Sequence, residues 1–156
     1  MSLSTLLAKH LRDVHFGGNW CAVDLKTTLS DVTWQQAAAN VHSLNSIYTL
    51  VFHNGYYLKL ILRVMEGGPL EGNDKLSFVH PPLDSQEAWE RLLAEIWANV
   101  ERLSELVEAL SEEQLTGPFS DGKYGTVYRN IAGFVEHTHY HLGQMRLIKK
   151  LLADMG

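Results

Sequence analysis

Cysteine is almost absent from the sequence: Cys21 is the only one among 156 residues. A lone cysteine excludes an intramolecular disulfide framework and a cysteine-rich zinc site. Such sparing use of cysteine is typical of a reducing compartment. The first residues, MSLSTLLAKHLRDVHF, lack the basic start and the apolar stretch of a signal peptide. We therefore expect a cytoplasmic protein.

Long apolar runs are missing as well. No run approaches the roughly 18 apolar residues that a membrane-spanning helix needs, so we expect no membrane partner. Positive charge is also scarce, with 13 Lys plus Arg against 18 Asp plus Glu and a formal net charge of -5. Because these basic residues are scattered, they offer no surface for a phosphate backbone, and we expect no nucleic-acid partner.

Sustained alternation of polar and apolar residues, the pattern of β-strands, is not found either. Apolar residues recur instead at helical spacing, in a chain that is 46% hydrophobic and of a length typical of one domain. We expect one domain over residues 1–156, with long helices at about 4–15, 43–66, 84–110 and 126–153. A shorter helical piece at 34–40 follows the capping sequence SDVT.

The connections between these helices are unequal. Residues 67–83 begin with Gly-Gly-Pro and contain His-Pro-Pro near their end, which makes them a crossover and not a tight turn. Residues 19–33 look irregular. These lengths predict an all-α four-helix bundle with crossover connections. The segment 43–66 is apolar on most sides, so we expect it to lie centrally in the bundle or at the contact of a homodimer.

Histidine is the residue the sequence has in excess, with eight in the chain and three of them in EHTHYHLGQM, residues 136–145. Each residue of an α-helix advances by about 100°, so His137 and His141 share one face, while His139 points roughly 160° away. The paired histidines share their face with apolar residues such as Phe134 and Met145. We expect the pair to face the bundle interior and His139 to face solvent or a neighbouring subunit.

Two imidazoles four residues apart on a helix can converge on one divalent transition metal. A third ligand has to come from another segment. His53, in LVFHNGYYL, has an apolar helical face, but His42 and His80 compete with it, so the residues alone leave the third ligand open. For any single histidine, an ordinary hydrogen-bonded role is the usual alternative. We interpret His10 and His15, like His80, as surface or capping residues.

These residues resemble the DinB/YfiT-like family, four-helix bundles with a histidine triad. The resemblance rests on His137 to Gln144, which has the family's His-x-x-x-His-x-Gly-Gln pattern, and on His53 midway along the second long helix. It extends over nearly the whole chain in the order and length of its elements, and His139 is an extra histidine within the motif. The resemblance selects His53 as the third ligand, so it implies a metal site formed by His53, His137 and His141. Imidazole ligands suit divalent transition metals such as nickel, copper or zinc, and we expect nickel or zinc.

The resemblance also implies a function. Family members are similar to thiol-dependent S-transferases and to a thiol-dependent isomerase, so we expect a metal-dependent transferase that joins a small-molecule thiol to an electrophilic substrate. Three imidazoles without a carboxylate leave positions on the metal for such ligands. Two alternatives stay open: a metal-dependent hydrolase and a non-catalytic bundle that binds metal or a small ligand. The hydrolase needs a general base. The ligand side of the last helix offers only Asn130 and Gln144, whose amides can form hydrogen bonds but cannot accept a proton.

Overall fold

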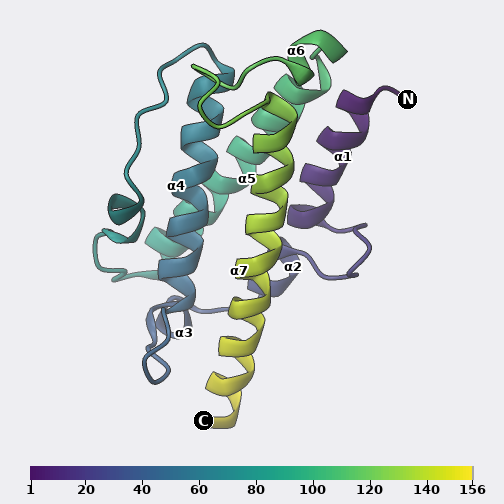
Figure 1. Cartoon of the computed structure of the whole chain (residues 1–156). Helices are drawn as coiled ribbons and strands as arrows, with labels where there is room; N and C mark the ends of the chain where they lie inside the picture. The colour runs from purple at the N-terminus through teal and green to yellow at the C-terminus, as the bar shows by residue number, and fades with distance from the viewer. Residues whose placement is uncertain (156) are drawn as a thin grey trace.

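Four long helices form the body of the protein in the computed structural model, which describes residues 1–155 (Figure 1). They are α1 (Leu3–Phe16), α4 (Ile47–Met65), α5 (Gln86–Glu108) and α7 (Val127–Met155). The described residues form no β-strand, only an isolated bridge between Pro118 and Thr126. The predicted all-α class and the four predicted long helices are therefore confirmed.

The long helices are arranged as a ring in which α1 contacts α5 and α7, and α4 contacts the same two helices. Figure 1 shows that α1 and α7 run in one direction, while α4 and α5 run in the other. Because α4 and α5 are parallel and consecutive, the chain between them has to return along the length of the bundle. Residues 66–85, called the crossover below, make this return, which confirms the predicted bundle with a crossover connection.

Four short helices lie in the connections: α2 (Leu25–Leu29), α3 (Trp34–Ala38), the 3₁₀ helix η1 (Asp74–Phe78) and α6 (Glu112–Thr116). The start of α3 agrees with its capping sequence, since Thr33 caps the helix and Gln36 completes a capping box. In contrast, α2 and η1 lie in segments that the sequence predicts to be irregular. Helices of one turn are too short to show a periodic apolar face, so their caps are their only signals.

The start of α4 differs from the prediction by four residues. Ser46 caps the helix by accepting a hydrogen bond from the Thr49 backbone N–H at 3.1 Å. Before it, His42 has a positive φ of 52° and is exposed. This left-handed backbone conformation cannot continue into a helix. His42 therefore lies outside α4.

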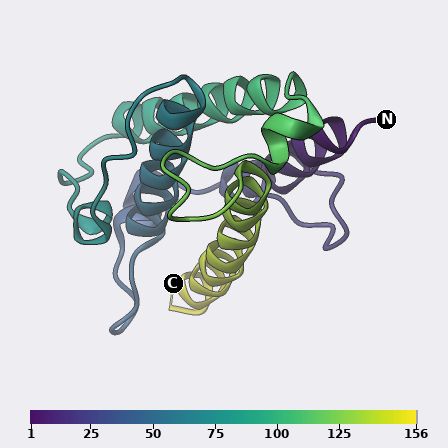
Figure 2. The same cartoon turned by 45° about the horizontal axis from the view of Figure 1, so that its top comes forward.

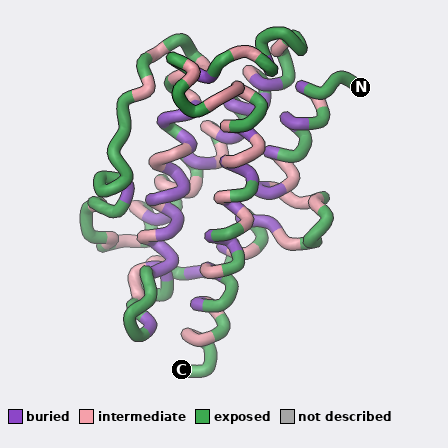
Figure 3. The backbone as a smooth tube through the Cα atoms, viewed as in Figure 1, coloured by how far each residue is buried: buried purple, intermediate pink, exposed green. Residues whose placement is uncertain are grey.

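The buried apolar side chains form one continuous cluster between the long helices (Figure 3). Within α4 only Lys59 and Arg63 are exposed, because α3, α5, α7 and η1 surround the helix. The nearly all-round apolar character of this helix is thus explained within one chain. It no longer argues for a homodimer, which stays a prediction.

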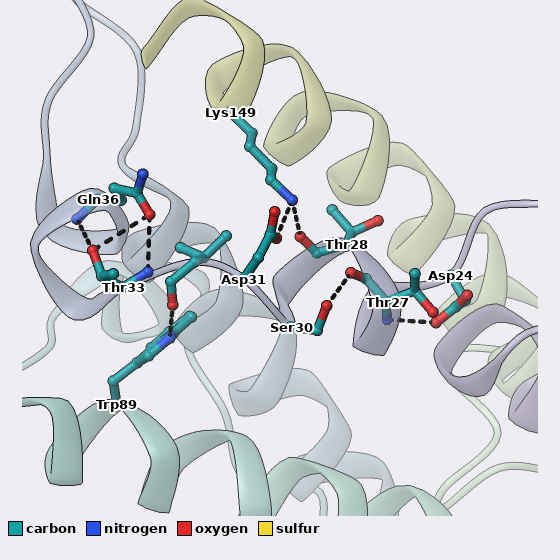
Figure 4. A network of polar contacts seen from close by, with 10 residues as sticks. Asp24, Thr27, Thr28, Ser30, Asp31, Thr33, Gln36, Trp89 and Lys149 are labelled. Atoms are coloured by element: carbon teal, nitrogen blue, oxygen red, sulfur yellow. Dashed lines mark hydrogen bonds and ion pairs between the residues drawn. The ribbon is translucent and has the colours of Figure 1, made fainter. Parts of the chain in front are cut away.

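The connection from α1 to α4 is attached to the bundle by polar contacts (Figure 4). The indole N–H of Trp89 on α5 donates to the Val32 carbonyl at 2.9 Å. Lys149 on α7 forms an ion pair with Asp31 and donates to the Thr28 carbonyl at 2.9 Å. Together these contacts fix the lower ends of α5 and α7 relative to the chain that leads into α4. No helix among residues 1–155 is both long and apolar enough to cross a membrane.

Candidate metal centre

Three histidines from two neighbouring antiparallel helices meet in the middle of the bundle. His53 is the seventh of the 19 residues of α4, and His137 and His141 lie one turn apart on α7. The Nε2 atom of His137 lies 3.0 Å from Nε2 of His53 and 3.0 Å from Nε2 of His141. The three possible ligand atoms all lie within 4.8 Å of one another. The structure therefore brings all three predicted ligands together, and this group is called the triad below.

The orientation of His53 is set by the crossover. Its Nδ1 lies 2.7 Å from the hydroxyl oxygen of Ser77, and both side chains are buried. The Ser77 hydroxyl donates its hydrogen to the Asp74 carbonyl at 2.5 Å, so its oxygen accepts from His53. We therefore assign the ring proton of His53 to Nδ1, which leaves a lone pair on Nε2.

The other two triad members are held by amide oxygens. Nδ1 of His137 lies 3.2 Å from Oδ1 of the buried Asn54, the residue after His53. Nδ1 of His141 lies 2.6 Å from Oε1 of Gln144, one turn further along α7. Amide oxygens only accept, so both imidazoles carry their proton on Nδ1. All three Nε2 atoms thus present lone pairs to one another.

This donor set fits a divalent cation. Three lone pairs facing each other without a proton between them repel, and a cation among them removes the repulsion. Two nitrogens that each lie about 2.1 Å from an ion are roughly 3.0 to 3.4 Å apart for right-angled to tetrahedral arrangements. The two Nε2 separations of 3.0 Å agree with this range. The triad can therefore hold a metal ion.

Two members of the triad, His137 and His53, are also poor at binding protons. Burial, together with the neighbouring His141 and His53, lowers the pKa of His137 to about 4. Burial and His141 lower the pKa of His53 as well, against a smaller opposing effect of Asp74. At neutral pH these two imidazoles are uncharged, which is the state that binds metal.

His139 and His15 lie on the other side of α7, where it meets α1. His139 points away from the triad, as its helical position predicts, but it is half-buried with its ring centre 6.5 Å from that of His10. It thus lies beside α1, and part of its surface stays exposed to solvent. His15, expected at the surface, is fully buried and stacks on Phe134 with ring centres 5.9 Å apart. Sequence periodicity places it beside Val14 and Leu11 but cannot show that α7 covers it.

The two rivals of His53 for the third ligand position lie elsewhere. His42 is exposed in the bend before α4. His80 is half-buried, with its Nε2 3.0 Å from the Thr49 hydroxyl and its ring against Tyr48. Neither belongs to the triad.

Aromatic rings cover the triad on the side of the crossover. Phe78 stacks on His53 with ring centres 4.2 Å apart, and Tyr57 presents an edge to His53 at 5.1 Å and to His137 at 5.2 Å. The Tyr57 hydroxyl donates to Oδ1 of Asp74 at 2.6 Å. Burial and this hydrogen bond raise the pKa of Tyr57 to about 12, so it stays a neutral donor. Tyr57 thus packs against the triad and also lines a cavity beside it.

A cavity of about 680 Å³ opens beside His137. Its walls come from α4, the crossover, the loop between α6 and α7 (residues 117–126) and the first three turns of α7. Figure 2 looks onto this end of the bundle, where the α6–α7 loop extends from α7 toward α4. The polar side chains in the wall are those of Tyr57, Asp74, Ser120, Asp121, Lys123, Tyr124, Arg129, Asn130 and His137. Its size suits a small molecule.

Three residues of the site escape prediction from the sequence. Asp74 brings a carboxylate to the cavity wall, and Ser77 orients His53, but both come from the crossover, which shows no periodic pattern. The sequence indicates a role for Asn54 only weakly. Its one clue is that an amide next to a ligand histidine in a helix can reach across to the neighbouring helix. Gln144, which the sequence places on the ligand side of the last helix, is the hydrogen-bond partner of His141.

Comparison with known proteins points to one family. No curated protein and no solved structure matches the chain. The sequence model of the DinB superfamily matches residues 23–145, a range that covers most of the chain and contains the complete triad. The chain therefore belongs to the DinB superfamily.

Proposed function

We propose that the protein is a metal-dependent S-transferase that joins a low-molecular-weight thiol to a small electrophile. One observation carries the proposal: the Nε2 atoms of His53 and His141 each lie 3.0 Å from Nε2 of His137, which lines a cavity large enough for both reactants. Nickel or zinc suits this all-imidazole donor set.

The neutrality of the triad favours a thiol as the partner. Serine and amide oxygens hold the three imidazoles, so no carboxylate is hydrogen-bonded to them. A divalent ion bound there supplies Lewis acidity, which lowers the pKa of a thiol bound beside it and favours the nucleophilic thiolate. The thiol has to come from outside, because Cys21 is exposed in the connection after α1 and does not line the cavity.

The proposed reaction is a substitution at the electrophile. The S–H bond and the bond from carbon to the leaving group break, and a C–S bond forms. The leaving group departs with the bonding electron pair and is neutralised by the proton released from sulfur. The chain contributes the walls that bring the two reactants together and the carboxylate of Asp74, which can accept the proton on its way to solvent.

An activity screen tests this proposal. The metal-loaded protein is incubated with 1-chloro-2,4-dinitrobenzene and a series of low-molecular-weight thiols, and formation of the thioether is followed by absorbance. We expect turnover that requires both the thiol and the metal and that is lost in His137→Ala. Absence of thiol-dependent turnover with every thiol would reject the transferase.

A metal-dependent hydrolase is the second candidate, and Asp74 is the observation in its favour. Its carboxylate lies on the same cavity wall as His137, so it supplies the general base that α7 lacks. A panel of esters and amides separates the two functions. Hydrolysis that needs no thiol and is lost in Asp74→Asn would favour the hydrolase. Absence of activity in both assays would favour a bundle that only binds metal or a ligand.

Two further parts of the proposal concern the setting of the protein. We propose a cytoplasmic location, because thiols are kept reduced there. We also propose a homodimer, which light scattering of the metal-loaded protein can test directly.

A further inference from the structure

We propose that the cavity selects an elongated thiol with a carboxylate at its far end, which Arg129 and Lys123 bind while the sulfur lies at the triad. This inference rests on the proposed thiol-dependent function and adds to it the class of thiol. It starts from two cations that line the cavity together with His137.

Neither cation has an acidic partner. Seven ion pairs are found among residues 1–155, and neither Arg129 nor Lys123 takes part in one. The two carboxylates of the cavity wall are engaged elsewhere: Asp74 accepts from the Tyr57 hydroxyl at 2.6 Å, and Asp121 accepts from the backbone N–H of Lys123 at 3.0 Å. Neither carboxylate pairs with Arg129 or Lys123, so both cations can contact an anionic ligand directly.

Arg129 is held in place before any ligand binds. Its Nη1 donates to the Tyr124 carbonyl at 3.2 Å. Its side-chain stem passes over Gly125, where a Cβ would lie 3.1 Å from Cδ of Arg129, and the φ of +83° at Gly125 further favours glycine. An arginine oriented in this way loses less freedom on binding a carboxylate, which its guanidinium recognises through two hydrogen bonds.

The position of Arg129 along α7 sets the length of the ligand. Arg129 and His137 are eight positions apart, which corresponds to about 12 Å along the helix axis at ~1.5 Å per residue. Both residues line the same cavity. A short mercapto acid cannot place its sulfur at the triad and its carboxylate at Arg129 at once, whereas a thiol with a chain of several bonds between the two groups can.

Isothermal calorimetry on the zinc-loaded protein tests this inference. The probes are 8-mercaptooctanoic acid, its uncharged counterpart 8-mercapto-1-octanol and the short 3-mercaptopropionic acid. We expect the long acid to bind about tenfold more tightly than the long alcohol, as for a charge-assisted hydrogen bond. We expect the short acid to bind no better than the long alcohol.

Substitutions identify the cations responsible. Arg129→Gln should remove the preference for the long acid, and Lys123→Gln should reduce it. The matched control is Arg146→Gln, because Arg146 is also an exposed arginine of α7 without an ion pair but lies outside the cavity. This control should leave the preference unchanged, and equal melting temperatures show that the variants are folded.

Two results would overturn the inference, and they differ from each other. Equal affinity for the long acid and the long alcohol, or an unchanged preference in Arg129→Gln, removes the carboxylate site and leaves the proposed function standing. If His137→Ala binds both long thiols as tightly as the unchanged protein does, the sulfur does not lie at the triad, and the proposed function fails too.

Discussion

Each imidazole of the triad is held by a neutral acceptor. Ser77, Asn54 and Gln144 fix the ring orientation and the proton on Nδ1, as partners of metal-bound histidines usually do. A carboxylate in the same position would fix the tautomer too, but it would also add a negative charge. Ser77, Asn54 and Gln144 therefore orient the ligands without adding a negative charge of their own.

The first prediction concerns the ligands. Single replacement of His53, His137 or His141 by alanine should abolish stoichiometric binding of nickel or zinc, measured by elemental analysis of the purified protein. His139→Ala is the control, because His139 faces α1 from the opposite side of α7. Loss of metal in His139→Ala would contradict the ligand set.

The second prediction concerns the partner of His137. Asn54→Leu removes the acceptor of His137 Nδ1, and loss of such a partner typically weakens metal binding about 10- to 100-fold. Competition with a chelator measures the affinity. Asn54→Asp keeps an acceptor oxygen at the same position and should restore binding. Equal affinity in Asn54→Leu and the unchanged protein would show that the hydrogen bond has no part in holding the ligand.

The third prediction concerns pH. Protons compete with the metal only below the pKa values of the metal-free imidazoles, and burial lowers the pKa of His137 to about 4. Metal should therefore stay bound below pH 6.5, the ordinary histidine value, and be lost as the pH falls toward about 4. Occupancy is measured after dialysis at each pH. Release that is complete at pH 6 would contradict the depressed pKa.

The residues of the site differ in how far the sequence predicts them. His137 and His141 follow from helical spacing alone, because both lie on one helix. His53 needs the family resemblance, since no local pattern relates it to a helix 84 residues away. Ser77 and Asp74 lie at the site because of the course of the crossover. The crossover has no periodic sequence pattern, so its course cannot be predicted from the sequence.

At the scale of elements, the contact between α1 and α7 contains a buried histidine of its own. His15 is fully buried, its Nδ1 bonds to the Leu11 carbonyl at 2.8 Å, and its Nε2 has no partner within residues 1–155. Burial lowers its pKa to about 4. Burial between α1 and α7 therefore favours the neutral imidazole of His15 over the charged imidazolium.

The fourth prediction follows from this contact. The contribution of His15 to stability is complete above the unfolded-state pKa of about 6.5, declines as the pH falls toward 4 and changes no further below it. Over this window it amounts to roughly 3 kcal/mol. In His15→Leu, the free energy of unfolding of the metal-free protein should fall less between pH 7 and pH 4. Urea titrations measure it, with the exposed His10→Gln as control.

The elements themselves divide into predictable and unpredictable ones. The long helices show apolar faces over many turns, and α3 has a complete capping box, so both kinds can be found from the sequence. The 3₁₀ helix η1 has one turn and mostly exposed residues. It forms where the crossover packs on α4. This packing depends on the tertiary structure, so the local sequence does not predict it.

At the scale of the whole molecule, a metal at the triad would connect α4 and α7 with the crossover that supports His53. The crossover directly follows α4 in the sequence, whereas α7 is distant from both. The fifth prediction is that the metal raises the melting temperature, because it binds the folded state alone. At a free concentration 100 times its Kd, the stabilisation is about 2.7 kcal/mol, or about 5 to 10 °C for a chain of this size.

Differential scanning fluorimetry with and without the metal measures this shift. His139→Ala should show the same increase as the unchanged protein, whereas His137→Ala should show none. An equal increase in both variants would mean that the metal stabilises the fold from another position.

The cavity has two kinds of wall. The triad and Arg129 stand on helices packed into the core, whereas the facing wall comes from the crossover and the α6–α7 loop, which carry exposed residues such as Asp74 and Lys123. Loops tolerate substitution and insertion far better than packed helices do. Evolution, or a protein engineer, can thus exchange these two loops to admit new substrates while the metal ligands stay where they are.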